Sequence, residues 1–350
     1  MSKKEEYLNY IHLFRGFAIL VIVGIHCRIS FGWPEQSLSK DILITLLDNG
    51  TVLFVFIAGF LFQYLRGKYD YTSYLQRKAK YVIIPYILVS IPAIALDLYV
   101  NPTPVWLPEN LIDQPKIVHA FYMIVTGKHL GPFWFIPMIT VFYLVSPILL
   151  KLDNLIFYKT VFPVLFLAGL FTYRFGYFSN TLDSFLHFFP VYIYGMWASH
   201  YRKKLINMRS RWLVFLVLIY LFLSALEIIN IIDVPRLSSF DEAATAPFFY
   251  FNIAKLKVSI LCVILLKIFY MLNKDILIFK YLGNYSFGIY FIHLYIITAI
   301  ERVINIIDPT FELNLITFIL YLTAVTLFSV FIVYFAKRIF KSNSRLLIGS

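Results

Sequence analysis

The 350-residue chain is 60% hydrophobic and 19% aromatic, and only 14% of its residues are charged. A soluble protein of this length needs far more polar surface, so the composition indicates an integral membrane protein. The formal net charge of +12 does not indicate a nucleic-acid-binding protein, because the lysines and arginines are spread between hydrophobic segments. Both cysteines, Cys27 and Cys262, fall in apolar segments, which argues against a structural disulfide and a metal site.

Apolar runs of spanning length predict a bundle of about ten transmembrane helices. No small-residue cleavage motif follows the first run, so we expect a retained helix and not a signal peptide. The expected fold class is all-α integral membrane, a polytopic bundle that forms a single domain over residues 1–350. The predicted spans are residues 9–29, 42–65, 79–99, 132–150, 160–177, 183–199, 211–231, 252–272, 282–300 and 312–336.

Positive charge alternates between the loops that join these spans. Loops such as 66–80 and 202–211 are rich in lysine and arginine, whereas the loops on the opposite side contain few. By the positive-inside rule, both termini (residues 1–8 and 337–350) are cytoplasmic, and the chain is a multi-pass protein of the cell (inner, cytoplasmic) membrane. Within the long external segment 101–130, prolines argue against a regular helix at the start. The apolar stretch 117–126 is too short to span and is expected to lie at the interface or re-enter.

Two basic side chains lie in the first span. Arg15 and His26 are eleven residues apart, which places them on one helix face and about 16 Å apart along its axis. A neutral imidazole suits a general base for a hydroxyl, although His26 could instead make a packing hydrogen bond. Arg15 stays charged and must meet an anion, a carbonyl or water, unless it snorkels to the cytoplasmic surface. Together they predict a polar path from one side of the membrane towards its middle.

Arg77 and Lys80 lie three residues apart at the start of the third span and share a helix face. Two cations at a helix start suit phosphate groups. From the residues alone, however, the usual excess of lysine and arginine on the cytoplasmic side is the simpler explanation. Pro85, within the same span, predicts a freed carbonyl or a kink.

Further polar candidates lie in later spans. Trp134 sits near the outer end of the fourth span, where an aromatic belt is expected. Ser286 and His293, one heptad apart with Tyr290 between them, form either an interhelical hydrogen bond or the wall of a site. Acidic residues near the external side are candidates to orient or charge-balance His26, with Asp48 the first choice: Asp48, Asp97, Glu227 and Glu301.

Five segments, in order along nearly the whole chain, resemble motifs of the membrane acyltransferase-3 family, which includes bacterial O-acyltransferases of surface polysaccharides. The first span contains the family's arginine and histidine within FRGFAILVIVGIH, and GTVLFVFIAGFLF from Gly50 resembles its second motif, with Ala58 replacing a serine. The other three are Arg77 and Lys80 at an R-x-x-R position, Trp134-Phe135-Ile136 for W-F-L, and SFGIYFIH ending at His293. The family often has a histidine just before W-F-L, where this chain has Gly131-Pro132-Phe133.

The resemblance implies that acyl-CoA, usually acetyl-CoA, is the donor substrate on the cytoplasmic side, with no bound cofactor. It implies that the acceptor is a sugar hydroxyl of a surface polysaccharide or lipid-linked glycan precursor. His26 would be the general base, Arg15 would hold the donor or the developing negative charge, and Arg77 and Lys80 would bind the CoA phosphates. A lysine cannot make the bidentate contact of an arginine. The remaining site residues would be Asp48, Trp134, Ser286, Tyr290 and His293.

Two other functions fit the same residues. An exporter of polysaccharide or lipid-linked sugar would also have a path lined with aromatic and charged side chains, but it would not release CoA. An inactive family member kept as a scaffold is the third hypothesis, against which intact Arg15 and His26 argue. An active enzyme would either acylate the sugar itself or pass the acyl group to a separate extracytoplasmic or polysaccharide-assembly partner.

Overall fold

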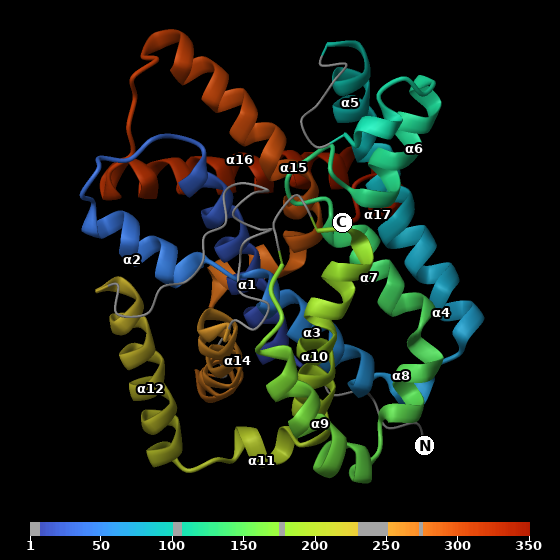
Figure 1. Cartoon of the computed structure of the whole chain (residues 1–350), viewed down its shortest axis with the longest axis vertical. Helices are drawn as coiled ribbons and strands as arrows, with labels where there is room; N and C mark the ends of the chain where they lie inside the picture. Colours follow the sequence, from blue (N-terminus) through green and yellow to red (C-terminus); the bar gives the residue numbers. More distant parts are fainter. Residues whose placement is uncertain (1–7, 101–106, 175–178, 230–250, 273–275) are drawn as a thin grey trace.

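The computed structural model describes residues 8–100, 107–174, 179–229, 251–272 and 276–350 (Figure 1). Within these ranges the regular secondary structure is helical, and an isolated β-bridge joins Gly32 to Glu312. The α-helices are α1 (Asn9–Ile29), α2 (Leu38–Leu47), α3 (Thr51–Tyr64), α4 (Tyr71–Lys78), α5 (Ile84–Tyr99), α6 (Lys116–Thr126), α7 (Phe135–Leu144), α8 (Ser146–Leu152), α9 (Leu155–Gly169), α10 (Thr181–His200), α11 (Arg202–Ile206), α12 (Ser210–Ile228), α14 (Ile253–Leu272), α15 (Leu277–Ile307), α16 (Leu315–Phe340) and α17 (Ser344–Leu347). Short 3-10 turns are η1 (Arg66–Lys68), η3 (Glu109–Leu111) and η5 (Lys341–Asn343), and η2 (Ala79–Ile83) is a π-helical turn.

Several helices are long and apolar enough to cross a membrane, so the all-α membrane class is confirmed. By length and composition there are six such stretches among the described residues: α1, Leu38–Tyr64, Tyr71–Tyr99, α12, α15 and Leu315–Leu347. The pair α7 and α8, bent by 64°, adds a seventh if it forms one broken span. These stretches coincide with the predicted spans 9–29, 42–65, 79–99, 132–150, 211–231, 282–300 and 312–336.

The other three predicted spans, 160–177, 183–199 and 252–272, fall on helices that do not meet this test. Helix α9 has only 15 residues and ends at Gly169, before residues 175–178, which lie outside the described part. Helices α10 and α14 have 20 residues each, but polar residues interrupt α10 and three lysines interrupt α14. The structure therefore supports six or seven spans, fewer than the predicted ten. Helix α9 is too short, and the polar residues of α10 and the lysines of α14 count against membrane crossing by hydropathy alone.

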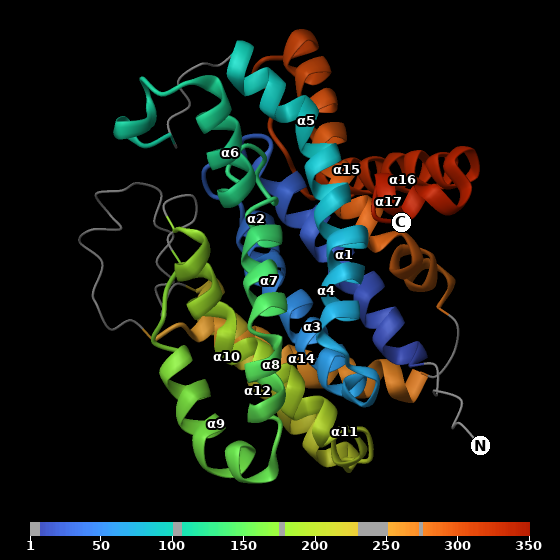
Figure 2. The same ribbon diagram turned by 90° about the vertical axis from the view of Figure 1, so that its right-hand side faces the viewer.

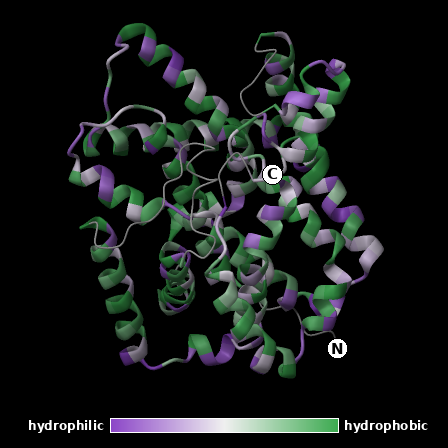
Figure 3. Ribbon diagram, viewed as in Figure 1, coloured by the Kyte–Doolittle hydropathy of each residue, from purple (hydrophilic) through white to green (hydrophobic). Residues whose placement is uncertain are grey.

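The three lysines of α14 are buried, and each is tied to a neighbouring helix. Lys255 Nζ donates to the carbonyl of Gly169 at the end of α9, at 2.8 Å. Lys257 pairs with Glu227 of α12, and Lys267 donates to a carbonyl at the end of α11 at 2.5 Å. A buried ammonium is costly unless it is hydrogen-bonded or paired, so these contacts make an otherwise apolar helix compatible with three charges. Helix α12, at one edge of Figure 1 and apolar along most of its length in Figure 3, is joined to the bundle through Lys257 and Glu227.

The expected irregularity at Pro85 takes the form of the π-helical turn η2. Proline has no N–H, so the carbonyl of Tyr81 cannot receive its usual helical hydrogen bond, and the wider turn at Ala79–Ile83 accommodates that loss. Figure 2 shows α4 and α5 as one nearly continuous helix across this turn. The apolar stretch predicted to be too short to span is α6, which ends at Gly127 in a left-handed conformation (φ 69°).

Helices α1 and α15 pack at unusually short distance, and glycines make this approach possible. A Cβ added at Gly16 would lie 2.0 Å from the carbonyl oxygen of Phe279, and one added at Gly283 would lie 2.6 Å from that of His12. Small residues that let backbones approach are typical of helix pairs in membranes. These contacts join the N-terminal parts of α1 and α15, and farther along both helices His26 meets His293, so the two helices run in the same direction.

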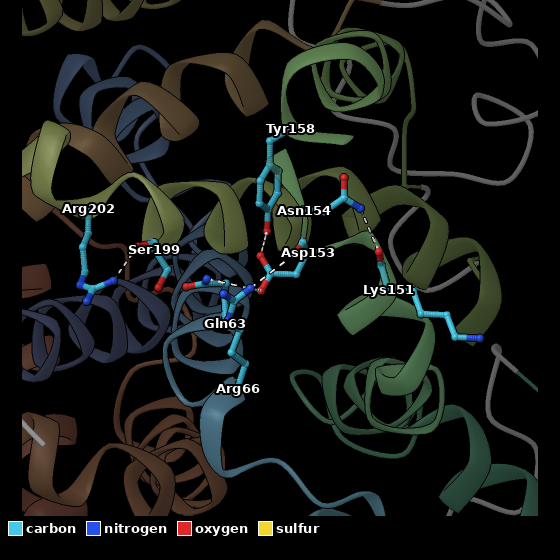
Figure 4. A network of polar contacts seen from close by, with 8 residues as sticks. All are labelled: Gln63, Arg66, Lys151, Asp153, Asn154, Tyr158, Ser199 and Arg202. Carbon is cyan, nitrogen blue, oxygen red and sulfur yellow. Dashed lines mark hydrogen bonds and ion pairs between the residues drawn. The ribbon is translucent and has the colours of Figure 1, made fainter. Parts of the chain in front are cut away.

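A buried carboxylate holds together the ends of α3, α8 and α9 on another side of the bundle (Figure 4). The side chain of Asp153 is 1% exposed, and its Oδ2 atom lies 2.5 Å from Arg66 Nη1. Tyr158 donates to Oδ1 at 2.8 Å, and Gln63 donates to Oδ2 at 3.4 Å. Burying a carboxylate is costly unless it is paired and hydrogen-bonded, and these three donors meet that requirement for Asp153.

Candidate functional site

The parallel packing of α1 and α15 places His26 opposite His293. Their ring centroids are 5.3 Å apart, with the ring planes inclined by 46°. His293 is fully buried, and its Nδ1 atom lies 3.0 Å from the carbonyl oxygen of Ile289. A carbonyl can only accept, so Nδ1 carries the proton and Nε2 carries a lone pair. That Nε2 atom is buried and has no hydrogen-bond partner, which leaves an acceptor available beside His26.

Arg15 meets a carbonyl, which is one of the partners that the sequence analysis allows. Its Nη2 atom donates to the carbonyl oxygen of Gly283 in α15 at 2.7 Å and lies 3.2 Å from His12 Nδ1. Ser286 Oγ donates to the same Gly283 oxygen at 3.0 Å. The structure therefore brings Arg15 and Ser286 together at one carbonyl, about three turns of α1 away from His26.

Tyr290 connects the histidine pair to the start of α7. Its ring centroid is 6.4 Å from that of His293, and its hydroxyl donates to the carbonyl of Pro132 at 2.6 Å. Trp134 lies on the same segment, but its ring stacks on that of Phe188 of α10, with the ring centroids 5.8 Å apart. The guanidinium carbon of Arg174 lies 3.5 Å from the centroid of the Trp134 ring. Tyr290 thus contacts the segment that carries Trp134, whereas the ring of Trp134 itself packs against α10 and Arg174.

Two of the four acidic candidates pair with other cations, whereas Asp97 and Glu301 take part in no ion pair among the described residues. Arg28 Nη2 donates to Asp48 Oδ1 at 3.1 Å, and Glu227 pairs with Lys257. Among the ion pairs of the described residues, none joins a carboxylate to His26, whose ring neighbour is an imidazole. In the same part of the chain, no group of three or more His, Cys, Asp or Glu side chains is arranged to hold a metal ion.

The segment that carries Arg77 and Lys80 presents both side chains on its exposed face. Between them, Lys78 turns inward, and its Nζ atom lies 4.7 Å from the ring centroid of Tyr143 and 5.3 Å from that of Tyr74. Sequence reasoning passed over Lys78 because Arg77 and Lys80 match the motif spacing. Three cations within four residues of a helix cannot all share its exposed face, and this was the available signal.

His129 is a second residue that sequence reasoning missed. It lies five residues before Trp134, so a search for a histidine directly before the tryptophan does not find it. Its Nδ1 atom lies 3.0 Å from the carbonyl of Met123, and its ring packs 5.5 Å from that of Phe133. Its buried Nε2 atom has no partner, and burial lowers the pKa of His129 to about 4. His129, through Phe133 and Tyr290, continues the line of side chains that begins at His26 and His293.

One family model, described as an acyltransferase domain of the acyltransferase-3 type, matches residues 8–336. No curated protein and no solved structure matches the chain significantly. The family match includes every helix that supplies the residues above, and it agrees with an all-helical fold that has several membrane-spanning helices. The chain therefore belongs to the acyltransferase-3 family and is a multi-pass membrane acyltransferase.

Proposed function

We propose that the protein transfers an acyl group, acetyl in the first instance, from acyl-CoA to a hydroxyl of a cell-envelope polysaccharide or its lipid-linked precursor. The observation that supports this proposal most is the pair His26 and His293, 5.3 Å apart within the helix bundle and close to Tyr290. Two imidazoles that face each other across an apolar interior suit proton transfer from a hydroxyl.

In the proposed reaction, the acceptor oxygen attacks the carbonyl carbon of the thioester while His26 takes the hydroxyl proton. The carbon–sulfur bond then breaks, and the CoA sulfur leaves as a thiolate that receives the proton from His26. His293 accepts a hydrogen bond at Nε2, because its Nδ1 is committed to Ile289, and so orients either the hydroxyl or the neighbouring imidazole. The products are an ester and free CoA, and no oxidant or metal is required.

In this proposal, Arg15 does not stabilise the reacting carbonyl. It lies about 16 Å from His26 along α1, which is too far for both side chains to act on one carbonyl. Arg15 is therefore assigned to the donor, farther from the thioester. Arg77 and Lys80 are assigned to the CoA phosphates, at the cytoplasmic end of the same path.

The topology that goes with this proposal has ten spans and both termini in the cytoplasm of a cell whose inner membrane holds the protein. It counts α9, α10 and α14 as spanning helices, with Lys257 of α14 paired to a carboxylate and its other two lysines hydrogen-bonded to backbone carbonyls. Labelling of single cysteines in η1 and in η5 from the cytoplasmic side would support it. Labelling of either turn from the outside would contradict it.

The function is tested by release of CoA thiol from acetyl-CoA and longer acyl-CoAs, using purified protein and crude envelope glycan. His26→Ala should lower glycan-dependent release by roughly 10²–10⁴-fold, since this is the usual contribution of a general base. His200→Ala is the matched control, because His200 packs on Tyr158 away from α1 and α15. Unchanged release by His26→Ala would refute the role of His26. Absence of release with every donor, despite demonstrated glycan binding, would refute acyl transfer and leave an exporter.

A further inference from the structure

Three cations from distant parts of the sequence gather beside the N-terminal part of α15. They are Lys78 of α4, Lys337 of α16 and Arg345 of α17. Arg345 lies close enough for its charge to act on both lysines, and Arg77 also acts on Lys78. Because like charges repel, a cluster of this kind destabilises the fold unless an anion accompanies it.

None of the ion pairs among the described residues involves these three cations. The ion pairs in this part of the chain involve Arg28, Arg66 and Lys257. Asp70 acts on Arg77 from the exposed start of α4, where its carboxylate caps the helix by accepting from the Ser73 amide at 2.9 Å. The aromatic rings of Tyr74, Tyr143, Tyr81 and Tyr285 accompany the cluster and leave its net positive charge unchanged.

Arg345 is held in place by the chain on both sides of it. Ser344 is buried, and its hydroxyl donates to the carbonyl of Lys341 at 2.8 Å. The guanidinium of Arg345 lies 4.3 Å from the ring centroid of Tyr81, and α17 packs against α5 and η2. Gly349 adopts a left-handed backbone (φ 73°) and lies so close to Phe287 that an added Cβ would be 2.4 Å from its ring. These contacts fix the position of the guanidinium relative to α4 and α15.

Through Lys337, the cluster lies at about the same level along α15 as Arg15, but on a different face of that helix. Lys337 Nζ is 4.8 Å from the ring centroid of Tyr285, which is two residues from the Gly283 carbonyl that Arg15 contacts. His293 lies eight residues farther along α15 than Tyr285, or about 12 Å along the helix axis. A ligand with a phosphate group at the cluster and an extended arm along α15 would thus pass the level of Arg15 before it reaches His293.

From these contacts we infer that Lys78, Lys337 and Arg345 form an anion site for phosphate groups, and that its ligand is the nucleotide part of the acyl-CoA donor. The assignment to the donor rests on the proposed function. It adds the inward-facing Lys78 to Arg77 and Lys80, which are both exposed, and it includes two cations that lie more than 250 residues from the R-x-x-R motif. Arginine and lysine are both suited to phosphate oxygens, and arginine offers a bidentate contact.

The test is titration of full-length protein in neutral detergent with CoA and with adenosine 3′,5′-bisphosphate at low ionic strength. Lys337→Ala and Arg345→Ala should each weaken binding of both probes about tenfold. Arg338→Ala is the matched control, since Arg338 is the exposed neighbour of Lys337 and should change binding less than twofold. Gly349→Ala keeps every charge but displaces the segment from Phe287, so it should reproduce the loss seen with Arg345→Ala.

The possible outcomes test the anion site independently of acyl transfer, and they distinguish CoA from an anionic lipid headgroup as its ligand. Equal affinity of wild type, Lys337→Ala and Arg345→Ala for CoA would overturn the inference even if His26-dependent transfer is found. Binding that needs both cations would support the anion site even if no acyl transfer is found. In nanodiscs, stabilisation by anionic lipid that is lost with Lys337→Ala, together with unchanged CoA affinity, would assign the cluster to the membrane and overturn the donor assignment.

Discussion

The close packing of α1 against α15 makes Gly16→Ala the most informative single substitution. The added Cβ would lie 2.0 Å from the carbonyl oxygen of Phe279 and 2.7 Å from its carbonyl carbon. Both are backbone atoms and cannot rotate away, and contacts under 3.0 Å are not tolerated. The two helices must therefore separate by about 1 Å at this level.

That separation should reach the histidine pair, because α1 and α15 are continuous helices between Gly16 and His26 and between Phe279 and His293. A displacement of 1 Å at reacting groups can lower a rate by about 10²-fold. Overpacking of this kind also costs about 1–3 kcal/mol in stability. We expect acyl transfer by Gly16→Ala to fall about a hundredfold, with a lower thermal midpoint but a folded protein.

The assay compares CoA release, thermal unfolding and elution as a single species for Gly16→Ala and for Gly24→Ala. Gly24 lies on the same helix, but the nearest atoms to its added Cβ are side-chain carbons of Leu47 at 3.2 and 3.3 Å. These atoms can move by a few tenths of an ångström, so Gly24→Ala should retain transfer within a few-fold. Equal transfer by the two variants would refute the reasoning that the spacing of α1 and α15 sets the reactivity of His26.

Three further predictions concern stability. Arg66→Ala should lower stability by about 3 kcal/mol, because it removes the cation from a buried carboxylate, whereas Lys151→Ala nearby should have no effect in the same thermal unfolding assay. His129 binds its proton more weakly when folded, so stability should fall as the pH drops below about 6.5, by about 1 kcal/mol at pH 5.5; an equal drop in His129→Leu would contradict this. Tyr290→Phe should lower stability by about 1–2 kcal/mol, because it leaves the carbonyl of Pro132 without its donor, and an unchanged thermal midpoint would argue against that hydrogen bond.

The span count shows that hydropathy alone does not identify a spanning helix that contains charged residues. Long apolar runs identify α1, α12, α15 and α16 because an apolar composition suits both a surface that faces lipid and a helix packed inside the bundle. For α14, the sequence does not show that its lysines meet Gly169, Glu227 and a carbonyl of α11, since those partners are far away in the chain. The local pattern is the same for an interior helix with satisfied charges and for a helix outside the membrane.

The sequence by itself determined the membrane class, the presence of Arg15 and His26 on one helix, and the family motifs, all of which depend on composition and short spacing. Only the tertiary structure decided that His26 faces His293, that Asp48 pairs with Arg28, and that Arg345 lies over the ring of Tyr81. The physical reason is that helical periodicity defines the faces of one helix, whereas the meeting of two faces depends on contacts between distant residues. In this protein, the backbone approach at Gly16 and Gly283 determines which residues of α15 lie opposite α1.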